Sequence, residues 1–510
     1  MQYTMNELIY NAKAPAESSV TVDLKAEFIA PSGKMITVKG FYCGNDTYKI
    51  RFYPIEPGTY KYSVSGIITD SGEIECVSND SVSKEGSYKS HGMVRPAGNH
   101  FRYDDGTWFY PFGTTVYALI HQEKKLIEQT LATLKGAPFN KVRMCVFPKD
   151  YDYNKNEPEL YAYEKDDNGK WDYNRPCYEF YEHLESVITE LNSYGIQCDL
   201  ILFHPYDRWG FSKMNMEEAD LYIDYITRRL SAYPNVWWSL ANEFDILDYS
   251  RCEWEHIAAK VHECDPFGHL LSNHNCIEFW DFDNKDTTHI CLQIKSVDDI
   301  NHMIDRYNKP LMVDECCYEG TIMLEWGNIS GFEMVNKFWK CITQGGYCTH
   351  GETYLCDDDI LWWSKGGILK GESPARIEFL KNIVEELPGP LTYCGDEFTR
   401  EKYEALKEDP EKCDNEFWRA VIKADWERAR EALTNGKEFM GCYEDLAYLR
   451  YYERKCPGKG IFDLPEDKKY IIEVIDVWNM TRQIAENGAS GHVEVVLPGK
   501  EGIALLARKI

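Results

Sequence analysis

The sequence predicts a (β/α)₈ barrel with a β-sandwich before it and a small β-domain after it. Three observations support this fold class. Residues 1–95 alternate apolar and polar side chains in short runs, residues 96–390 alternate apolar runs with amphipathic stretches, and strand-like runs return after residue 468. Alternating strands and helices are typical of βαβ units around a parallel sheet, and short alternating strands are typical of sandwiches. We therefore expect domains at residues 1–95, 96–390 and 391–510.

The first domain is expected to be all-β. Alternation is clearest at residues 20–28, 48–52 and 60–64, and turn sequences containing Gly, Pro, Asn or Asp separate these runs. Such turns at short intervals between alternating runs are the usual pattern of a sandwich.

Eight apolar runs are candidate barrel strands. They cover residues 108–117, 141–147, 197–204, 236–242, 269–273, 289–293, 311–314 and 346–350. Helical stretches are expected at residues 123–135, 178–194, 218–232, 331–344 and 373–387. Eight strands in about 290 residues fit a closed barrel better than an open doubly wound sheet. No GxGxxG or Walker A motif favours the open sheet.

The last part of the chain is expected to be helical first and then β. Residues 391–455 are rich in charged residues and helix formers, whereas residues 470–477, 492–496 and 503–508 have the character of strands. We therefore expect a helical segment followed by a C-terminal β-domain.

Charge and cysteine content limit the function classes. The net charge of −28 over 510 residues argues against nucleic acid and anionic membranes as partners. No run of about 18 apolar residues is present to span a membrane. Eighteen cysteines without an apolar leader predict reduced thiols and a cytoplasmic location. No CxxC or similar spacing occurs, so we expect no metal and no cofactor, while a homo-oligomer stays open.

Two glutamates end the fourth and seventh candidate strands. Glu243 follows residues 236–242, and Glu315 follows residues 311–314. Barrel enzymes hold their catalytic groups at the C-terminal ends of strands, and two facing carboxylates are what a glycosidase needs. We expect Glu243 to be the general acid/base and Glu315 the nucleophile, about 5–5.5 Å apart as in retaining enzymes. Asp314 is a competing carboxylate, expected to point the opposite way from Glu315 because side chains alternate along a strand.

Polar and aromatic residues recur near the same ends of the strands and are expected to contact the substrate. Asn242 is placed to hydrogen-bond a sugar 2-hydroxyl, a contact that strengthens in the transition state. Arg143 is placed to orient Glu315. The expected substrate contacts are Arg143, His204, Asn242, His274, Gln293, His350, Glu352, Tyr354, Trp362 and Trp363.

The sequence favours a glycosidase over two other function classes. A non-catalytic carbohydrate-binding or scaffold protein on a barrel would be favoured by loss of either glutamate, and both are present. An esterase or metal hydrolase would need a GxSxG or HExxH motif, and neither occurs.

The pair Asn242-Glu243 and the later Glu315 resemble clan A of the glycoside hydrolases, which includes family 5. Arg143, His204 and a late tryptophan match positions commonly filled in family 5. A more specific resemblance covers nearly the whole chain. FYCGNDTYKIRFYP (residues 41–54) with GTYKY (58–62), HFRYDDGT (100–107) with FGTTVYA (112–118), and DVWNMT (476–481) are similar to the N-terminal, barrel and C-terminal domains of a bacterial group with an apiosidase-like barrel.

This resemblance implies retaining hydrolysis without a metal. We expect an oligosaccharide or glycoside as substrate, of the neutral plant type. Family 5 usually has His-x-Tyr on strand six, which residues 290–293 lack. The particular sugar therefore does not follow from the resemblance.

Overall fold

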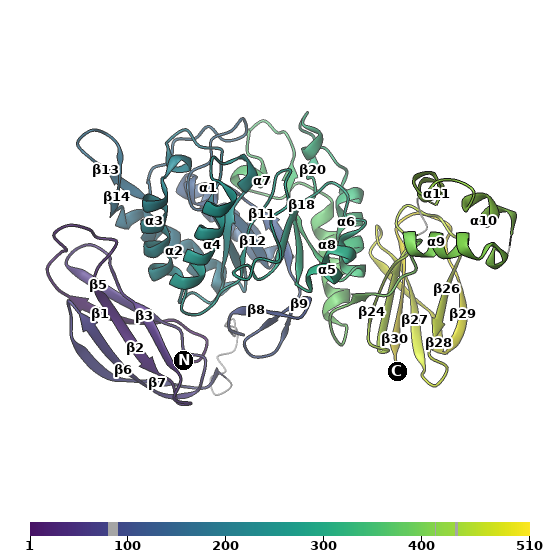
Figure 1. The fold of residues 1–510 in the computed structure, drawn as a ribbon, viewed down its shortest axis with the longest axis horizontal. Helices are drawn as coiled ribbons and strands as arrows, with labels where there is room; N and C mark the ends of the chain where they lie inside the picture. The colour runs from purple at the N-terminus through teal and green to yellow at the C-terminus, as the bar shows by residue number, and fades with distance from the viewer. Residues whose placement is uncertain (80–89, 414, 434–436) are drawn as a thin grey trace. The chain divides into compact units, whose positions relative to one another are not determined.

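The computed structural model describes residues 1–79, 90–413, 415–433 and 437–510. The chain separates into two compact units (Figure 1). One unit holds residues 1–334 and 347–381, and the other holds residues 335–346 and 382–510. The division into three domains at residues 95 and 390 remains a prediction.

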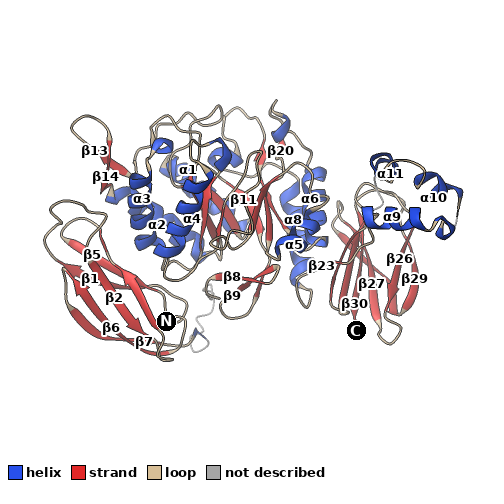
Figure 2. Cartoon of the chain, in the orientation of Figure 1, coloured by secondary structure: helices blue, strands red, loops and turns tan. Residues whose placement is uncertain are grey.

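Eight parallel strands form a nearly closed barrel in the first unit, which confirms the predicted fold class (Figure 2). In chain order they are β11 (Phe112–Thr115), β12 (Lys141–Cys145), β15 (Gln197–Phe203), β16 (Val236–Ala241), β17 (Leu271–Ser272), β18 (Ile290–Gln293), β19 (Leu311–Glu315) and β21 (Tyr347–His350). The connecting helices include α1 (Lys124–Gly136), α2 (Tyr178–Ser193), α3 (Met216–Leu230), α4 (Arg251–Cys264) and α5 (Ile300–Tyr307), while α6 (Gly331–Thr343) and α8 (Ser373–Glu385) each continue into the second unit. Neighbouring strands pair in chain order except β17 with β18, and β21 pairs with β11.

One backbone and one side-chain hydrogen bond bridge the seam between β17 and β18. The N–H of Thr288 donates to the carbonyl of Leu271 over 2.8 Å at one end. At the other end, the N–H of Gln293 donates to Oδ1 of Asn275 over 2.9 Å. An amide side chain thus replaces a missing ladder bond at the end of the barrel where the strands stop.

The predicted first strand is divided in two. β10 (Trp108–Phe109) pairs antiparallel with β9 (His100–Tyr103), which also pairs with β8 (Val94–Ala97), and β11 begins only after Pro111. Proline has no N–H to give to a ladder, so strands break at such a position.

Strand β16 shows why the barrel strands were recognisable. All six of its residues, VWWSLA, are buried. A barrel strand is covered by helices outside and side chains inside, so its apolar run is continuous rather than alternating. The indole N–H of Trp238 donates to Asp265 over 3.1 Å, and that of Trp237 donates to Gln197 over 3.1 Å. The two rings therefore fill the core without leaving a donor unpaired.

Two antiparallel sheets form the N-terminal sandwich. One contains β1 (Asn6–Asn11), β5 (Thr47–Phe52) and β4 (Phe41–Tyr42), and the other contains β3 (Met35–Lys39), β2 (Leu24–Ile29), β6 (Gly58–Gly66) and β7 (Asp70–Cys76). Phe28 and Phe52 stack in its core with ring centroids 3.9 Å apart. Arg51 links the sandwich to the barrel by donating to Glu185 on α2 over 2.8 Å.

The second unit is mainly an antiparallel sheet. Its strands, in spatial order, are β23 (Thr392–Tyr393), β24 (Phe439–Tyr443), β25 (Ala447–Tyr451), β30 (Ile503–Lys509), β27 (Tyr470–Asp476) and β28 (Thr481–Ala489), and β26 (Lys459–Leu464) pairs with β29 (Gly491–Val496). Short helices α9 (Arg400–Glu408), α10 (Glu416–Val421) and α11 (Trp426–Ala432) precede most of these strands.

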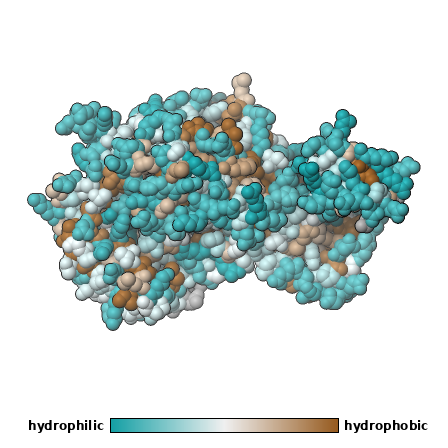
Figure 3. All heavy atoms as spheres, viewed as in Figure 1, coloured by the Kyte–Doolittle hydropathy of each residue, from teal (hydrophilic) through white to brown (hydrophobic). Residues whose placement is uncertain are grey.

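The surface agrees with the composition. The face visible in Figure 3 is largely hydrophilic, as the high content of charged residues predicts. None of the helices in the described part of the chain has the length and apolar character that a membrane crossing requires.

Candidate active site

Glu243 lies two residues beyond the end of β16. Its backbone has a φ of +57°, in the left-handed region, where the short helix Phe244–Ile246 begins. A non-glycine residue in this region costs on the order of 1–2 kcal/mol, and such strain is often found at functional sites. The side chain is only 6% exposed.

A β-bulge determines how Asp314 and Glu315 are oriented. Leu292 and Gln293 are adjacent on β18, yet they pair with Val313 and Glu315 on β19. Asp314 is the extra residue, and a bulge turns neighbouring side chains away from strict alternation. The expectation that Asp314 and Glu315 point in opposite directions is therefore corrected, because both contact residues inside the barrel.

Asp314 is part of a fully buried ion pair. Lys141 lies with its Nζ 2.6 Å from Oδ1 of Asp314, and the hydroxyl of Thr349 donates to the same oxygen over 2.6 Å. Burial raises the pKa of Asp314, but Lys141 and Arg143 outweigh it and hold that pKa well below its usual range. Asp314 thus has a structural partner, and Glu315 remains as the second carboxylate of the site.

Glu315 contacts a tyrosine, an arginine and a histidine. The hydroxyl of Tyr117 donates to Oε1, Nη1 of Arg143 lies 3.6 Å from that oxygen, and Nε2 of His274 lies 3.7 Å from it. Burial raises the pKa of Glu315, and the negative charge of Glu243 raises it further. Arg143 opposes both effects.

Glu243 has its own hydrogen-bond donors. The hydroxyl of Tyr206 donates to Oε2, and Nε2 of Gln293 donates to Oε1 over 3.1 Å. The backbone N–H of Glu243 donates to Nδ1 of His274 over 3.4 Å. Burial lowers the pKa of His274 well below its usual value, so the ring is neutral. Since Nδ1 accepts, Nε2 carries the hydrogen and faces Glu315, which places His274 against both glutamates.

Asn242 and His204 complete the polar surroundings. Oδ1 of Asn242 lies 2.9 Å from the hydroxyl of Tyr117, which also contacts Glu315. Nε2 of His204 donates to the carbonyl of Phe147 over 3.2 Å, and its Nδ1 has no hydrogen-bond partner within the described chain. Burial lowers the pKa of His204 to about 4.

Sequence reasoning missed Tyr117, Lys149 and Tyr206. The Nζ of Lys149 lies 3.4 Å from the ring centroid of Tyr117 and 4.3 Å from that of Tyr206. Such cation–π contacts stabilise a buried ammonium, while burial lowers its pKa. Each of the three residues lies a few positions beyond the end of a barrel strand. Tyr117 is the last residue of the predicted strand 108–117, whereas a search of the loops after the predicted strands 141–147 and 197–204 would have found Lys149 and Tyr206.

Aromatic side chains gather beside Glu315. Trp363 lies 6.0 Å from Tyr117, 5.2 Å from Tyr151 and 5.4 Å from Tyr318, measured between ring centroids. The loop that carries Tyr151 continues into a hairpin of β13 (Tyr163–Lys165) and β14 (Trp171–Pro176). The start of this loop therefore borders the site.

Four predicted substrate contacts lie in another buried group. Nδ1 of His350 lies 3.0 Å from Oγ1 of Thr114, and the indole N–H of Trp362 donates to the same oxygen over 2.8 Å. The hydroxyl of Tyr354 donates to Glu319, and Glu352 accepts hydrogen bonds from the backbone. The structure thus does not place these four beside Glu243 and Glu315.

Strand pairing explains why these four residues lie away from the two glutamates. After β21, the chain forms β22 (Glu352–Thr353), which pairs in parallel with β20 (Glu319–Gly320). Burial raises the pKa of Glu352 to about 7, although the N–H groups of Lys370 and Gly371 oppose it.

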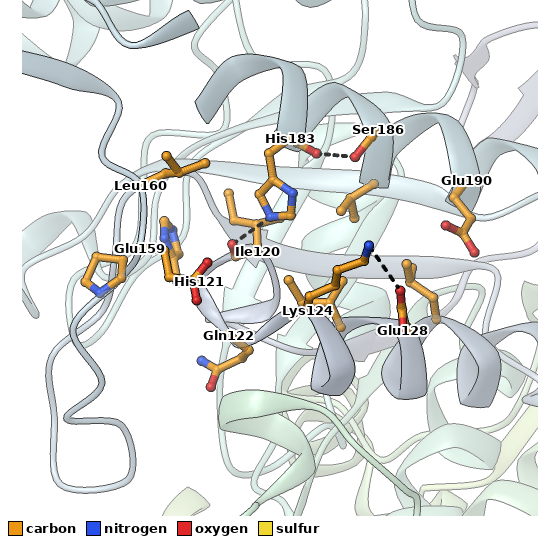
Figure 4. Close-up of a pocket in the computed structure, with 14 residues that line it drawn as sticks. Ile120, His121, Gln122, Lys124, Glu128, Glu159, Leu160, His183, Ser186 and Glu190 are labelled. Atoms are coloured by element: carbon orange, nitrogen blue, oxygen red, sulfur yellow. Dashed lines mark hydrogen bonds and ion pairs between the residues drawn. The ribbon is translucent and has the colours of Figure 1, made fainter. Parts of the chain in front are cut away.

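A pocket of about 420 Å³ lies elsewhere, between α1 and α2 (Figure 4). Lys124 and Glu128 from α1 and His183 and Glu190 from α2 are among its lining residues. Its lining includes none of the residues that contact Glu243 or Glu315. The convergence of polar groups on two buried carboxylates marks a site better than this pocket does.

Three segments of the chain match known protein families. Residues 95–388 match the family described as "Apiosidase-like, catalytic domain". Residues 1–66 and 436–507 match two domains of unknown function, DUF5060 and DUF5605. No curated protein matches the chain significantly.

Solved structures give the same result. A candidate glycoside hydrolase from Bacteroides vulgatus ATCC 8482 is 32% identical with a TM-score of 0.84, and the match covers 100% of this chain and 99% of that one. A family 5 glycoside hydrolase from the same organism is 15% identical with a TM-score of 0.59, covering 82% of this chain and 94% of that one. At 15% identity, the similarity to the family 5 enzyme shows a shared fold only.

Proposed function

The chain belongs to the Apiosidase-like family and is a glycoside hydrolase in fold and family, and we propose that it cleaves glycosidic bonds by double displacement. Glu315 is the nucleophile and Glu243 the general acid/base in this proposal. The observation that carries it is that two buried glutamates follow or end β16 and β19 on either side of His274: the backbone N–H of Glu243 donates to Nδ1 over 3.4 Å, and Oε1 of Glu315 lies 3.7 Å from Nε2. Paired carboxylates of this kind are the catalytic apparatus of most glycosidases.

In the first step, a carboxylate oxygen of Glu315 attacks the anomeric carbon. The bond to the leaving oxygen breaks as Glu243 gives that oxygen its proton, and a glycosyl ester forms. In the second step, Glu243 takes a proton from water, the water oxygen attacks the same carbon, and Glu315 leaves. Two inversions at one carbon retain its configuration.

The charges around the pair support this division of roles. Arg143 and Lys149 both act on Glu315 and favour its ionised form. We therefore assign the nucleophilic carboxylate to Glu315, whose negative charge these two cations stabilise against burial and against the charge of Glu243. Tyr117 hydrogen-bonds Glu315 and thereby orients the attacking oxygen.

The remaining residues of the site are assigned to substrate binding. Asn242 is proposed to bind the sugar hydroxyl next to the anomeric carbon, and Trp363 to stack on a sugar ring. The other proposed substrate-binding residues are Arg143, His204, His274 and Gln293. A neutral plant-type oligosaccharide is the proposed substrate, because the net charge of −28 disfavours acidic sugars.

We propose a cytoplasmic location, because a sequence with 18 cysteines and no paired metal-type spacing is typical of a protein kept reduced in such a compartment.

Hydrolysis of aryl glycosides of neutral pentoses and hexoses tests the proposed function. The wild-type protein should release the phenol from at least one of them. Glu315→Gln should lower kcat by on the order of 10³-fold or more, because a neutral amide cannot replace the nucleophile. Glu325→Gln, at an exposed position ten residues on, is the matched control and should stay active. Binding without hydrolysis by the wild type would favour a carbohydrate-binding protein instead.

A further inference from the structure

Glu319, His350 and Glu352 form a second buried polar group outside the proposed active site. Each is at most 1% exposed, and one possible ligand atom from each lies within 4.8 Å of the others. Glu319 lies on β20, which follows the seventh barrel strand. His350 ends β21, the eighth barrel strand, and Glu352 lies on β22 just after it. We propose that this group binds one divalent transition-metal ion, and that Zn²⁺ is its best match.

Neither carboxylate has a close cationic side-chain partner among the described residues. No lysine or arginine there forms an ion pair with Glu319 or Glu352, although the charge of Lys370 acts on Glu352 from a greater distance. Removing a carboxylate from water costs several kcal/mol, and a buried one is normally paired or coordinates a metal. Two such groups side by side are therefore neutralised either by a proton or by a bound cation.

The hydrogen bonds of the group leave acceptor capacity on Glu352. Both oxygens of Glu319 receive two donors each, from the Tyr354 hydroxyl, the Glu372 N–H and the N–H and hydroxyl of Ser373. Each oxygen of Glu352 receives only one, a backbone N–H. A carboxylate oxygen accepts two, so each oxygen of Glu352 retains a free lone pair.

His350 points an unpartnered nitrogen at the same place. Its Nε2 is buried without a hydrogen bond and lies 3.7 Å from Oε2 of Glu352. This distance is too long for a hydrogen bond. Two ligands at about 2.0–2.2 Å from a tetrahedral Zn²⁺ lie about 3.4 Å apart, which is close to the observed separation.

The other nitrogen of His350 has a suitable partner. Nδ1 lies 3.0 Å from Oγ1 of Thr114. Donation from Nδ1–H to this oxygen leaves Nε2 as the free acceptor. Metal-bound histidines usually donate their second N–H in this way, which fixes the tautomer and the ring orientation.

Gly371 shows that the backbone approaches both carboxylates closely. A Cβ at this position would lie 2.5 Å from Oε2 of Glu319 and 2.5 Å from Oε2 of Glu352. Real Cβ atoms do not come so near, so only glycine fits. The segment 370–373 thus supplies N–H groups to both carboxylates.

The imidazole of His350 and the carboxylate of Glu352 would coordinate the ion, while the charge of Glu319 lies beside them, and this ligand chemistry selects the kind of metal. Ca²⁺ and Mg²⁺ prefer ligand sets made of oxygen, whereas an imidazole nitrogen suits Zn²⁺. The ion would join the loops after β19 and β21. Glu319 follows Tyr318, whose ring lies 5.4 Å from that of Trp363 beside Glu315. The proposed ion is therefore structural and would hold one wall of the active site.

The sequence predicted no metal because the ligands show no recognisable spacing. His350 and Glu352 are two residues apart, whereas Glu319 lies 31 residues before His350. Only the parallel pairing of β20 with β22 brings them together.

Metal analysis of the purified protein tests this proposal independently of any glycosidase activity. The full chain is expressed without a polyhistidine tag in medium containing zinc and is analysed by mass spectrometry of the elements. We expect about one Zn²⁺ per chain. Glu352→Gln and His350→Gln should each lower this content at least about tenfold. Glu372→Gln, at an exposed neighbouring carboxyl, should retain the ion.

Wild-type protein from metal-depleted medium provides the second measurement, which does not depend on the folding of a variant. One equivalent of ZnCl₂ should raise its Tm by more than about 2 °C, and the same amount of CaCl₂ should not. Metal-free protein from zinc medium, together with an unchanged Tm, would show that the group holds a proton and would overturn the proposal. Equal zinc content in the wild type and both variants would place the ion elsewhere and would also overturn it.

Discussion

Arg143 lies with its Nη1 3.6 Å from Oε1 of Glu315, and the guanidinium is completely buried. None of its three nitrogens makes a hydrogen bond in the described part of the chain. Arg143 therefore acts on Glu315 mainly through its charge, and its donors stay available to substrate or water. This charge favours the ionised form of Glu315, whereas burial and Glu243 raise its pKa.

The first prediction concerns the pH dependence of activity. The proposed nucleophile must be ionised, so kcat/KM should fall as the pH drops through the raised pKa of Glu315. Arg143→Gln removes a favourable charge and should move this acidic limb upward by about 1 pH unit. Profiles of kcat/KM for the wild type and the variant measure the shift.

Two further variants make this test decisive. Lys149→Gln should shift the acidic limb in the same direction, because Lys149 also lowers the pKa of Glu315. Arg251→Gln, on α4 with 41% of its side chain exposed, should leave the profile unchanged. An acidic limb that stays in place in both Arg143→Gln and Lys149→Gln would show that these cations do not act on the nucleophile.

The second prediction concerns Glu243→Ala. Substrates with good leaving groups need little proton donation, so their first step should survive. The second step should stall because no base activates water, and added azide should restore turnover and yield a glycosyl azide. Rates for aryl glycosides of different leaving-group pKa, with and without azide, measure this. Equal losses for good and poor leaving groups, with no azide effect, would exclude Glu243 as the acid/base.

The third prediction concerns the link between the sandwich and the barrel. Glu185 accepts hydrogen bonds from Arg51 over 2.8 Å and from Arg229 over 2.6 Å. Glu185→Gln leaves both cations without their buried carboxylate and should lower the free energy of unfolding by about 3–5 kcal/mol. Glu182→Gln, on the same helix but exposed, should change it by less than about 0.5 kcal/mol. Urea denaturation of the three proteins measures the difference.

The same carboxylate gives stability a defined pH dependence. Burial raises the pKa of Glu185, but Arg229 and Arg51 outweigh it and hold the pKa at about 2, below the ordinary glutamate value of 4.5. A depressed pKa contributes stability above the unfolded value, and this contribution is lost as the pH falls from about 4.5 toward 2. The Tm of the wild type should therefore fall more steeply over this range than that of Glu185→Gln. Parallel curves would contradict the ion pair.

The barrel could be predicted from sequence because its strands are continuous apolar runs, as β16 shows. The positions of Glu243 and Glu315 followed because both come directly after such runs. Local breaks were harder to predict. The division at Pro111 was readable in hindsight, but the bulge at Asp314 depends on pairing with β18, which no local pattern encodes.

The rest of the site depended on loop paths that the sequence does not reveal. Tyr117, Lys149 and Tyr206 lie beyond the strand ends, and their convergence is set by how those loops fold over the barrel. His350 ends the last barrel strand and Glu352 follows it, and both are positions where a substrate contact is expected. The pairing of β22 with β20 nevertheless brings them next to Glu319. Glu319 lies 31 residues before His350 in the sequence, so no local pattern could reveal this contact.

The stereochemistry of the first product tests the proposed double displacement most directly. Once an active aryl glycoside is found, proton NMR can follow its hydrolysis by the wild-type enzyme within minutes of mixing, before mutarotation. The anomeric proton of the first sugar released should show the same configuration as the substrate, because Glu315 and then water each invert the carbon once. An inverted first product would mean that water attacks directly, and Glu315 would then not be the nucleophile.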